Sequence, residues 1–271
     1  MTTVIGFVNQ KGGVGKTTTA VNLAACIASA NRRVLLVDMD PQSNSTSAVG
    51  IGRDGPSIHD VLIDAMPAAN AVCATFVENL NILPSNPSLY GAEIELLDSS
   101  EREYRLKTAI QPLRDTQGAS QRTSIPVYDY ILIDAPPSLG LLTLNVLAAS
   151  DTLIIPVQCE YYALEGLSLL IHTVDRVRVA LNPDLLLLGI VMTMHDGRLN
   201  ISRQVVEEVR NHFGDKVFNT VIARSVRLTE APSHGQPIIF YDPRSTGAQN
   251  YISLAVEVIH AAEKTGIGQR T

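Results

Sequence analysis

Short apolar runs rich in β-branched residues alternate along the chain with longer stretches of helical periodicity. The runs predict six strands, at residues 3–8, 33–38, 80–84, 128–133, 152–157 and 186–193. Several of them, such as 34–37 and 153–155, are continuously apolar, which is typical of strands covered by helices on both faces. The alternation predicts an α/β fold in which crossover helices join parallel strands.

Helical periodicity predicts helices in the segments between these strands, at residues 16–30, 57–65, 88–113, 139–149, 161–180, 200–213 and 246–264. Residues 114–127 are polar and rich in turn formers, so we expect a surface loop there. We see no internal repeat and no second boundary, and therefore expect one domain over residues 1–271 with a flexible tail from about residue 264.

A glycine-rich run follows the first predicted strand and opens the first predicted helix. It reads Lys11-Gly12-Gly13-Val14-Gly15-Lys16-Thr17-Thr18. Strand, glycine loop and helix form the context of a phosphate-binding P-loop, in which backbone N–H groups and the helix N-terminus surround an anion. Lys16 would then neutralise the β- and γ-phosphates, and the Thr17 hydroxyl would ligate Mg²⁺. The fold class is accordingly a P-loop NTPase with a twisted, mostly parallel sheet and helices on both faces.

Two details of the run separate it from other glycine motifs. The standard P-loop pattern has glycine where this chain has Gln10, and Lys11 adds a second positive charge that one bound nucleotide does not require. A dinucleotide-binding fingerprint starting at Gly13 would need glycine at position 18, which is Thr18. A glycine-rich turn with incidental lysines is the remaining alternative.

Three carboxylates follow predicted strands directly. Asp38 and Asp40 come after the second strand, and Asp134 comes after the strand at 128–133. Ligands of open α/β sheets bind beyond the carboxyl ends of the strands, so we expect these groups to converge on the glycine loop. Asp134 fits a Mg²⁺ partner acting through water, and a turn or helix-capping aspartate is its alternative.

Asp38 and Asp40 are two residues apart and would face the same way on an extended segment. We assign Asp40 to the attacking water, and Asp38 to support of Mg²⁺ or a lysine. An Asx turn leading into Pro41 is the alternative for either residue.

Composition narrows the class of protein further. The 271 residues carry a net charge of −6, so any nucleic-acid contact would need a local basic patch. No apolar stretch reaches the length of a membrane span, and residues 1–30 lack a secretory pattern. Cys26, Cys73 and Cys159 are scattered without metal-binding spacing, which indicates a reducing cytoplasm.

Six motifs together resemble the ParA/Soj partition ATPases, within the deviant Walker A group that also holds MinD and the nitrogenase iron protein. They are KGGVGKTTT, DMDPQSNST, IDAPPS, TMHDGR, RSVRLTEAPSHG and YDPRSTGAQNY. The first three are common to the group, whereas the last three point to chromosome or plasmid partition. The resemblance extends from Val4 to about Ala262.

The resemblance implies ATP or ADP with Mg²⁺ as cofactors and a nucleotide-sandwich homodimer. It implies that Lys11 reaches the partner's phosphates, that Gly12 lies where the two loops approach, and that Asp40 is needed for hydrolysis, alongside Lys16. It also places Met194 and Arg224 at the nucleotide, although this chain has Ile-Ala-Arg-Ser at 222–225 where the family often has a stretch like IPRN.

Arg198 and Arg227 match arginines that bind double-stranded DNA without sequence preference in Soj-like proteins. Residues 195–245 hold seven Arg/Lys and six Asp/Glu, so a solvated face is the alternative. The resemblance further implies a ParB-type partner that stimulates hydrolysis, and a cytoplasmic, nucleoid-associated protein.

Two other functions fit the sequence less well than partition does. A MinD-like membrane-surface ATPase would need a basic amphipathic C-terminal helix, but residues 261–271 are polar and broken by glycine. An iron–sulfur reductase would need matched interface cysteines, and Cys159 has no partner motif.

Overall fold

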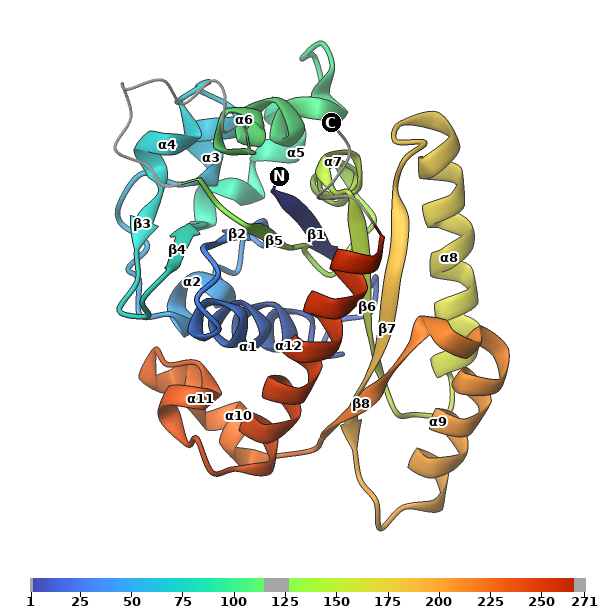
Figure 1. Cartoon of the computed structure of the whole chain (residues 1–271). Coiled ribbons are helices and arrows are strands. Elements are labelled where there is room, and N and C mark those ends of the chain that lie inside the picture. The colour runs from blue at the N-terminus through green and yellow to red at the C-terminus, as the bar shows by residue number, and fades with distance from the viewer. Residues whose placement is uncertain (1, 115–126, 266–271) are drawn as a thin grey trace.

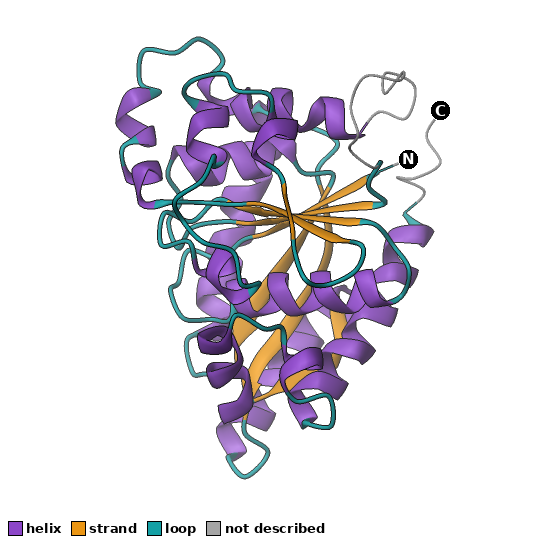
Figure 2. Ribbon diagram, turned by 90° about the vertical axis from the view of Figure 1, so that its left-hand side faces the viewer, coloured by secondary structure: helices purple, strands orange, loops and turns teal. Residues whose placement is uncertain are grey.

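The computed structural model describes residues 2–114 and 127–265, which form one eight-stranded sheet with helices on both faces (Figures 1 and 2). The strand order is β3-β4-β2-β5-β1-β6-β7-β8, with β3 antiparallel to β4 and all other neighbours parallel. The strands are β1 (Thr3–Phe7), β2 (Val34–Asp38), β3 (Cys73–Ala74), β4 (Leu80–Leu83), β5 (Tyr130–Asp134), β6 (Thr152–Gln158), β7 (Leu186–His195) and β8 (Val217–Ala223).

The sheet separates two hydrophobic cores because successive side chains of a strand point to opposite faces. In β2, Leu35 and Val37 enter one core, and Val34 and Leu36 enter the other. This explains the continuous apolar runs in the sequence.

The first core is covered by α3 (Ile58–Leu62), α4 (Ala68–Ala71), α5 (Ala92–Glu95), α6 (Arg105–Arg114), α7 (Leu141–Ala149), α8 (Ala163–Ala180) and α9 (Asn200–Phe213). The second is covered by α1 (Lys16–Ser29), α2 (Asn44–Ala48), α10 (Val226–Glu230), α11 (Ile238–Tyr241) and α12 (Thr246–Lys264). In Figure 1, α1 and α12 lie against each other on this second face, and they are in direct contact.

All six predicted strands are present with small shifts at their ends. The strands β3 and β8 were not predicted. β8 is an edge strand whose apolar pattern is interrupted by Asn219 and Thr220. Their N–H groups donate to the Glu257 carboxylate at 2.7 and 2.8 Å, so a side chain from α12 replaces the missing neighbouring strand.

The predicted helix over 88–113 is wrong as a continuous element. The chain instead forms a 3₁₀ turn at Pro87–Tyr90, then α5, an irregular stretch, a second 3₁₀ turn at Arg102–Tyr104, and α6. The turn-forming run Asp98-Ser99-Ser100 ends the first part, and Glu101 has a φ of 52°, which no α-helix accommodates. The other predicted helices are present, although that at 57–65 is shortened to α3. The predicted loop at 114–127 and the predicted tail lie largely outside the described residues.

Candidate nucleotide and magnesium site

The three motifs that follow strands meet at one edge of the sheet. β5 lies between β1 and β2, so Phe7 and Asp38 both stand in register with Asp134. The glycine loop continues from β1 into α1 at the same edge. The convergence expected from the strand pattern is therefore what the fold produces.

The glycine loop depends on glycine at two positions. Gly13 and Gly15 have φ values of 76° and 85°, in the left-handed region that side chains disfavour. The Thr193 hydroxyl of β7 donates to the Val14 carbonyl at 2.8 Å and so holds the loop from a neighbouring strand. By contrast, a Cβ on Gly12 would meet nothing closer than Pro137 at 3.9 Å. The fold of this chain therefore does not itself require glycine at position 12.

A cavity of about 780 Å³ opens beside the loop, within the usual size range of ligand pockets. The predicted nucleotide contacts that line it are Gly12, Gly13, Gly15, Lys16, Thr17, Thr18, Met194 and Arg224. Lys11 and Val14 instead line a smaller neighbouring cleft of about 280 Å³. The cavity thus joins the loop to the segment around residue 224, which is far away in sequence.

Lys16 is buried at the start of α1. Burial lowers the pKa of its ammonium group, and the carboxylates of Asp134 and Asp40 oppose that change. A buried cation next to a helix N-terminus attracts a phosphate strongly because little water screens it.

Asp134 is fully buried, and its two oxygens have different surroundings. Oδ2 accepts a 2.8 Å hydrogen bond from the Ser45 hydroxyl, whereas Oδ1 has no hydrogen-bond partner among the described residues. Burial raises the pKa of Asp134 to about 6, opposed by the nearby hydroxyls of Thr17 and Ser45 and by Lys16. A buried carboxylate oxygen without a donor fits a hard cation such as Mg²⁺, with Thr17 close by.

Both oxygens of Asp38 are occupied. Oδ2 accepts from the backbone and hydroxyl of Thr46 at 2.8 and 2.7 Å, and Oδ1 accepts from the Asp40 N–H at 3.1 Å. Burial and the neighbouring Asp134 raise the pKa of Asp38 to about 7. Through these contacts Asp38 holds the segment after β2 in place. The assignment of Asp38 to the metal stays a prediction, and the hydrogen bonds of its oxygens do not favour it.

Asp40 combines the two interpretations drawn from the sequence. Its Oδ1 accepts from the Gln42 N–H at 2.9 Å, which is the Asx turn, and its side chain also lines the cavity. Burial raises the pKa of Asp40, whereas the Gln42 N–H and Lys16 lower it. A carboxylate with a raised pKa is a better proton acceptor, so the turn positions a group that could orient water.

Lys11 points away from the cavity of its own chain. Its ammonium group forms an ion pair with Glu160, in the connection between β6 and α8, and its N–H donates to Asn9 Oδ1 at 3.0 Å. About half of the side chain is exposed. The extra charge of the loop therefore lies at the surface, paired with Glu160.

Arg198 and Arg227 are both exposed and both paired with carboxylates. Arg198 Nε and Nη2 donate to Asp196 at 2.9 and 2.6 Å, which lowers the pKa of Asp196. Arg227 contacts Glu230 at 2.9 Å and Asp242 at 3.5 Å. Both predicted DNA contacts are thus paired with acidic residues of the same segment, as the nearly balanced charge of residues 195–245 allows.

Sequence reasoning did not single out Ser45, Thr46 and Thr193. The first two belong to the DMDPQSNST motif, and their hydroxyls bind Asp134 and Asp38. Thr46 also accepts from the Ser85 N–H at 2.9 Å, which ties the segment to the end of β4. The motif itself was the signal that could have identified them.

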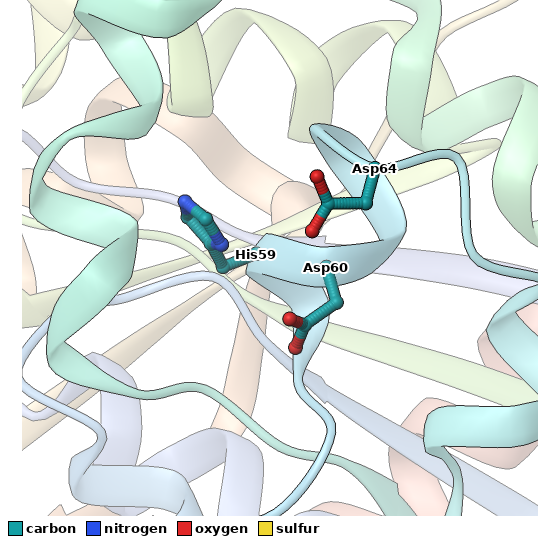
Figure 3. A group of neighbouring side chains, drawn as sticks. All are labelled: His59, Asp60 and Asp64. Atoms are coloured by element: carbon teal, nitrogen blue, oxygen red, sulfur yellow. The ribbon is translucent and has the colours of Figure 1, made fainter.

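A second group of titratable side chains lies around α3 and consists of His59, Asp60 and Asp64 (Figure 3). Helix capping explains its central member, because Asp60 Oδ2 accepts from the backbone and hydroxyl of Ser57 at 2.7 and 2.9 Å. His59 Nε2 lies 3.3 Å from Glu95. These local contacts account for His59 and Asp60 without a metal ion.

Comparison with known proteins gives a consistent set of similarities. A family model described as an AAA domain matches residues 2–187. The sporulation initiation inhibitor protein Soj of Bacillus subtilis is 54% identical over 257 residues, covering 94% of this chain and 97% of Soj. The chromosome partitioning protein ParA of Myxococcus xanthus is 52% identical, covering 94% of this chain and 87% of ParA.

Two solved structures share the fold. A Mycobacterium smegmatis protein described as cobyrinic acid a,c-diamide synthase, with bound ADP and magnesium, has a TM-score of 0.82 at 36% identity, covering 98% of this chain and 97% of that one. The septum site-determining protein MinD of Pyrococcus horikoshii, complexed with Mg-ADP, has a TM-score of 0.76 at 26% identity and covers the whole of both chains.

Proposed function

This chain belongs to the ParA/Soj family of chromosome-partitioning ATPases, and we propose that it acts as a switch in which ATP closes a DNA-binding dimer. The proposal rests on Lys16, Asp40 and the Asp134 oxygen that has no hydrogen-bond partner within residues 2–114 and 127–265, all around a nucleotide-sized cavity. Phosphoryl transfer needs positioning and charge neutralisation, which these groups supply.

Each part of the site has a proposed role in hydrolysis. The backbone N–H groups of the loop and Lys16 bind the phosphates, and Met194 and Arg224 line the part of the cavity that would hold the nucleoside. Thr17 and Asp134 would hold Mg²⁺, which supplies charge neutralisation at the phosphates when it is bound. Asp40 would orient the attacking water and accept its proton.

Lys11 and Gly12 support the dimer. Lys11 is exposed and does not line the cavity of its own chain, while Gly12 is uncrowded within the subunit. In a sandwich of two loops, Lys11 would exchange Glu160 for the phosphates of the partner, and a side chain at position 12 would separate the two loops. ATP then favours the dimer because that state binds its γ-phosphate better, and ADP favours the monomer.

The closed dimer would bind double-stranded DNA through Arg198 and Arg227. Contacts to phosphate carry no sequence information and weaken with salt. A ParB-type partner would stimulate hydrolysis and release, and the protein would be cytoplasmic and associated with the nucleoid. The two arginines would have to exchange their present carboxylate partners for DNA phosphates.

No helix of the described residues is long and apolar enough to cross a membrane. The iron–sulfur rival gains no support from the cysteines. Burial raises the pKa of Cys26 and Cys159 to about 12, which disfavours the thiolates that an iron–sulfur cluster requires. The likeness to the cobyrinic acid a,c-diamide synthase is at lower identity than that to Soj and ParA.

DNA co-sedimentation with ATP, with ADP and without nucleotide, across a salt series, tests the proposal. We expect ATP-dependent binding that fades with salt, stronger retention for Asp40→Ala because hydrolysis is blocked, and no binding for Lys16→Ala. Equal DNA binding with ATP and ADP would refute the switch. Light scattering of Asp40→Ala with ATP should show a dimer, and a monomer would contradict the sandwich.

A further inference from the structure

The segment that begins at Pro87 and includes α5 is apolar on two opposite faces. Leu89 and Ala92 belong to the first core, and Leu96 is also buried. Tyr90, Ile94 and Leu97 are 64, 74 and 56% exposed. Exposed apolar side chains that share one face of a segment are typical of an interaction site. We call Tyr90, Ile94 and Leu97 the outer row.

The other exposed apolar side chains include pairs, such as Ile252 and Val256 one turn apart on α12, and single residues. Phe76 packs edge-on against Phe240 with ring centroids 5.5 Å apart, and Tyr161 packs against Tyr162 at 5.1 Å. Val179, on α8, is 84% exposed but isolated on its turn, as a single surface apolar residue commonly is. The outer row differs because its three members recur at helical spacing on one short segment.

The outer row is surrounded by negative charge. Residues 87–101 contain Glu93, Glu95, Asp98 and Glu101 and no lysine or arginine. Glu95 faces His59, but Asp98 and Glu101 are exposed and form no ion pair within the described residues. The nearest following cation, Arg102, is engaged by Glu103 and by the Leu97 carbonyl.

The outer row is also held on a fixed support. Glu93 Oε1 accepts from the Leu142 N–H at 3.4 Å, at the start of α7, and its carboxylate fills the space where a Cβ on Gly140 would lie. The helix α7 begins shortly after the 134–138 motif and packs into the first core. A preorganised surface loses little conformational freedom when a ligand binds.

We propose that the outer row is a docking surface for a basic amphipathic segment of a partner protein. The apolar residues of that segment would cover Tyr90, Ile94 and Leu97, and its lysines or arginines would pair with Asp98 and Glu101. This mode is the helix-on-groove type of recognition with complementary charge at its rim. Complementary charge steers association and excludes acidic partners.

Other occupants match the surface less well. In a two-fold contact between copies of this chain, the same carboxylates would face each other, which is unfavourable. Residues 115–126 and 266–271 each contain one arginine and one isoleucine, which is too little apolar area and charge to complement the row. DNA phosphates would be repelled by Asp98 and Glu101.

A labelled helical peptide of leucines and lysines, about 18 residues long, serves as the probe, with a peptide of leucines and glutamates as its counterpart. Binding to the full chain is measured by fluorescence anisotropy without nucleotide. We expect the lysine peptide to bind and the glutamate peptide not to bind. Ile94→Ser with Leu97→Ser should weaken binding by about tenfold or more, as loss of central apolar contacts does.

Matched controls separate this surface from general attraction to an acidic protein. Val179→Ser with Val256→Ser removes equally exposed apolar side chains elsewhere. Asp98→Lys should weaken binding, whereas Asp54→Lys, with the same change in net charge on an exposed loop residue, should not. Equal affinity of the outer-row variants and the wild type, or equal losses in the controls, would overturn the proposal.

A change in oligomeric state of the outer-row variants by light scattering would assign the surface to a second copy and also overturn it. Because binding is measured without nucleotide, this test does not depend on the partition switch. ATP-dependent DNA co-sedimentation of the outer-row variants should be normal, so failure of one proposal is distinguishable from failure of the other.

Discussion

Asp134→Asn should stabilise the nucleotide-free protein while removing its response to Mg²⁺. The carboxylate is fully buried, and its Oδ1 has no hydrogen-bond partner among the described residues. Burial raises its pKa from 3.8 to about 6. At 1.36 kcal/mol per unit, keeping this group ionised in the folded state costs about 3 kcal/mol. The net shift already includes the attraction to Lys16. A buried asparagine amide carries a desolvation cost of its own, so we expect a net gain of about 1–2 kcal/mol at pH 8.

The gain should depend on pH in a defined direction. Because the folded-state pKa is above the unfolded value, the folded protein binds the proton more tightly. The stability of the wild type therefore falls as pH rises from about 4 to about 6 on account of this group. Asp38, with a pKa raised to about 7, extends the same trend upward. The advantage of the asparagine variant should be full at pH 8 and should vanish near pH 4.

Urea denaturation in EDTA at several pH values measures the effect, with and without Mg-ATP. A ligand at 100 times its Kd stabilises the folded state by about 2.7 kcal/mol, and the wild type should gain in this way whereas the variant should gain little. The order of stability should thus reverse when Mg-ATP is added. A variant that is less stable than the wild type at pH 8 without metal, or a difference that does not change with pH, would refute the reasoning.

Three further changes test other parts of the site. Gly12→Val should leave unfolding unchanged, as Gly55→Val should, but should abolish the ATP-dependent dimer seen by light scattering; a dimer of normal stability would disprove the predicted loop contact. Thr193→Val removes a buried 2.8 Å hydrogen bond and should cost about 1–3 kcal/mol in urea denaturation and weaken ATP binding, whereas Thr193→Ser should retain both. Arg198→Ala with Arg227→Ala should lower DNA affinity and reduce the salt slope by about 2 while sparing dimerisation; an unchanged slope would place the DNA contact elsewhere.

Local pattern determined much of the fold. A buried parallel strand needs apolar residues on both faces. For this reason β1, β2, β5 and β6 can be predicted from short apolar runs in the sequence. The positive φ values of Gly13 and Gly15 are a local backbone property that favours glycine. The glycine loop is therefore recognisable from the sequence as well. Local pattern does not predict a strand that is stabilised by distant side chains. An example is β8, where the Glu257 carboxylate accepts the hydrogen bonds of the edge N–H groups.

The sequence by itself determined the family, the strands that the functional motifs follow, and the residue types in those motifs. Tertiary structure decided how those residues are used. Both oxygens of Asp38 accept hydrogen bonds, whereas Oδ1 of Asp134 has no hydrogen-bond partner in the described part of the chain, although both aspartates end neighbouring strands. Tertiary structure also turned Lys11 out of its own cavity. Hydrogen bonding and burial depend on groups brought together from distant parts of the chain, and such neighbours are not encoded in spacing alone.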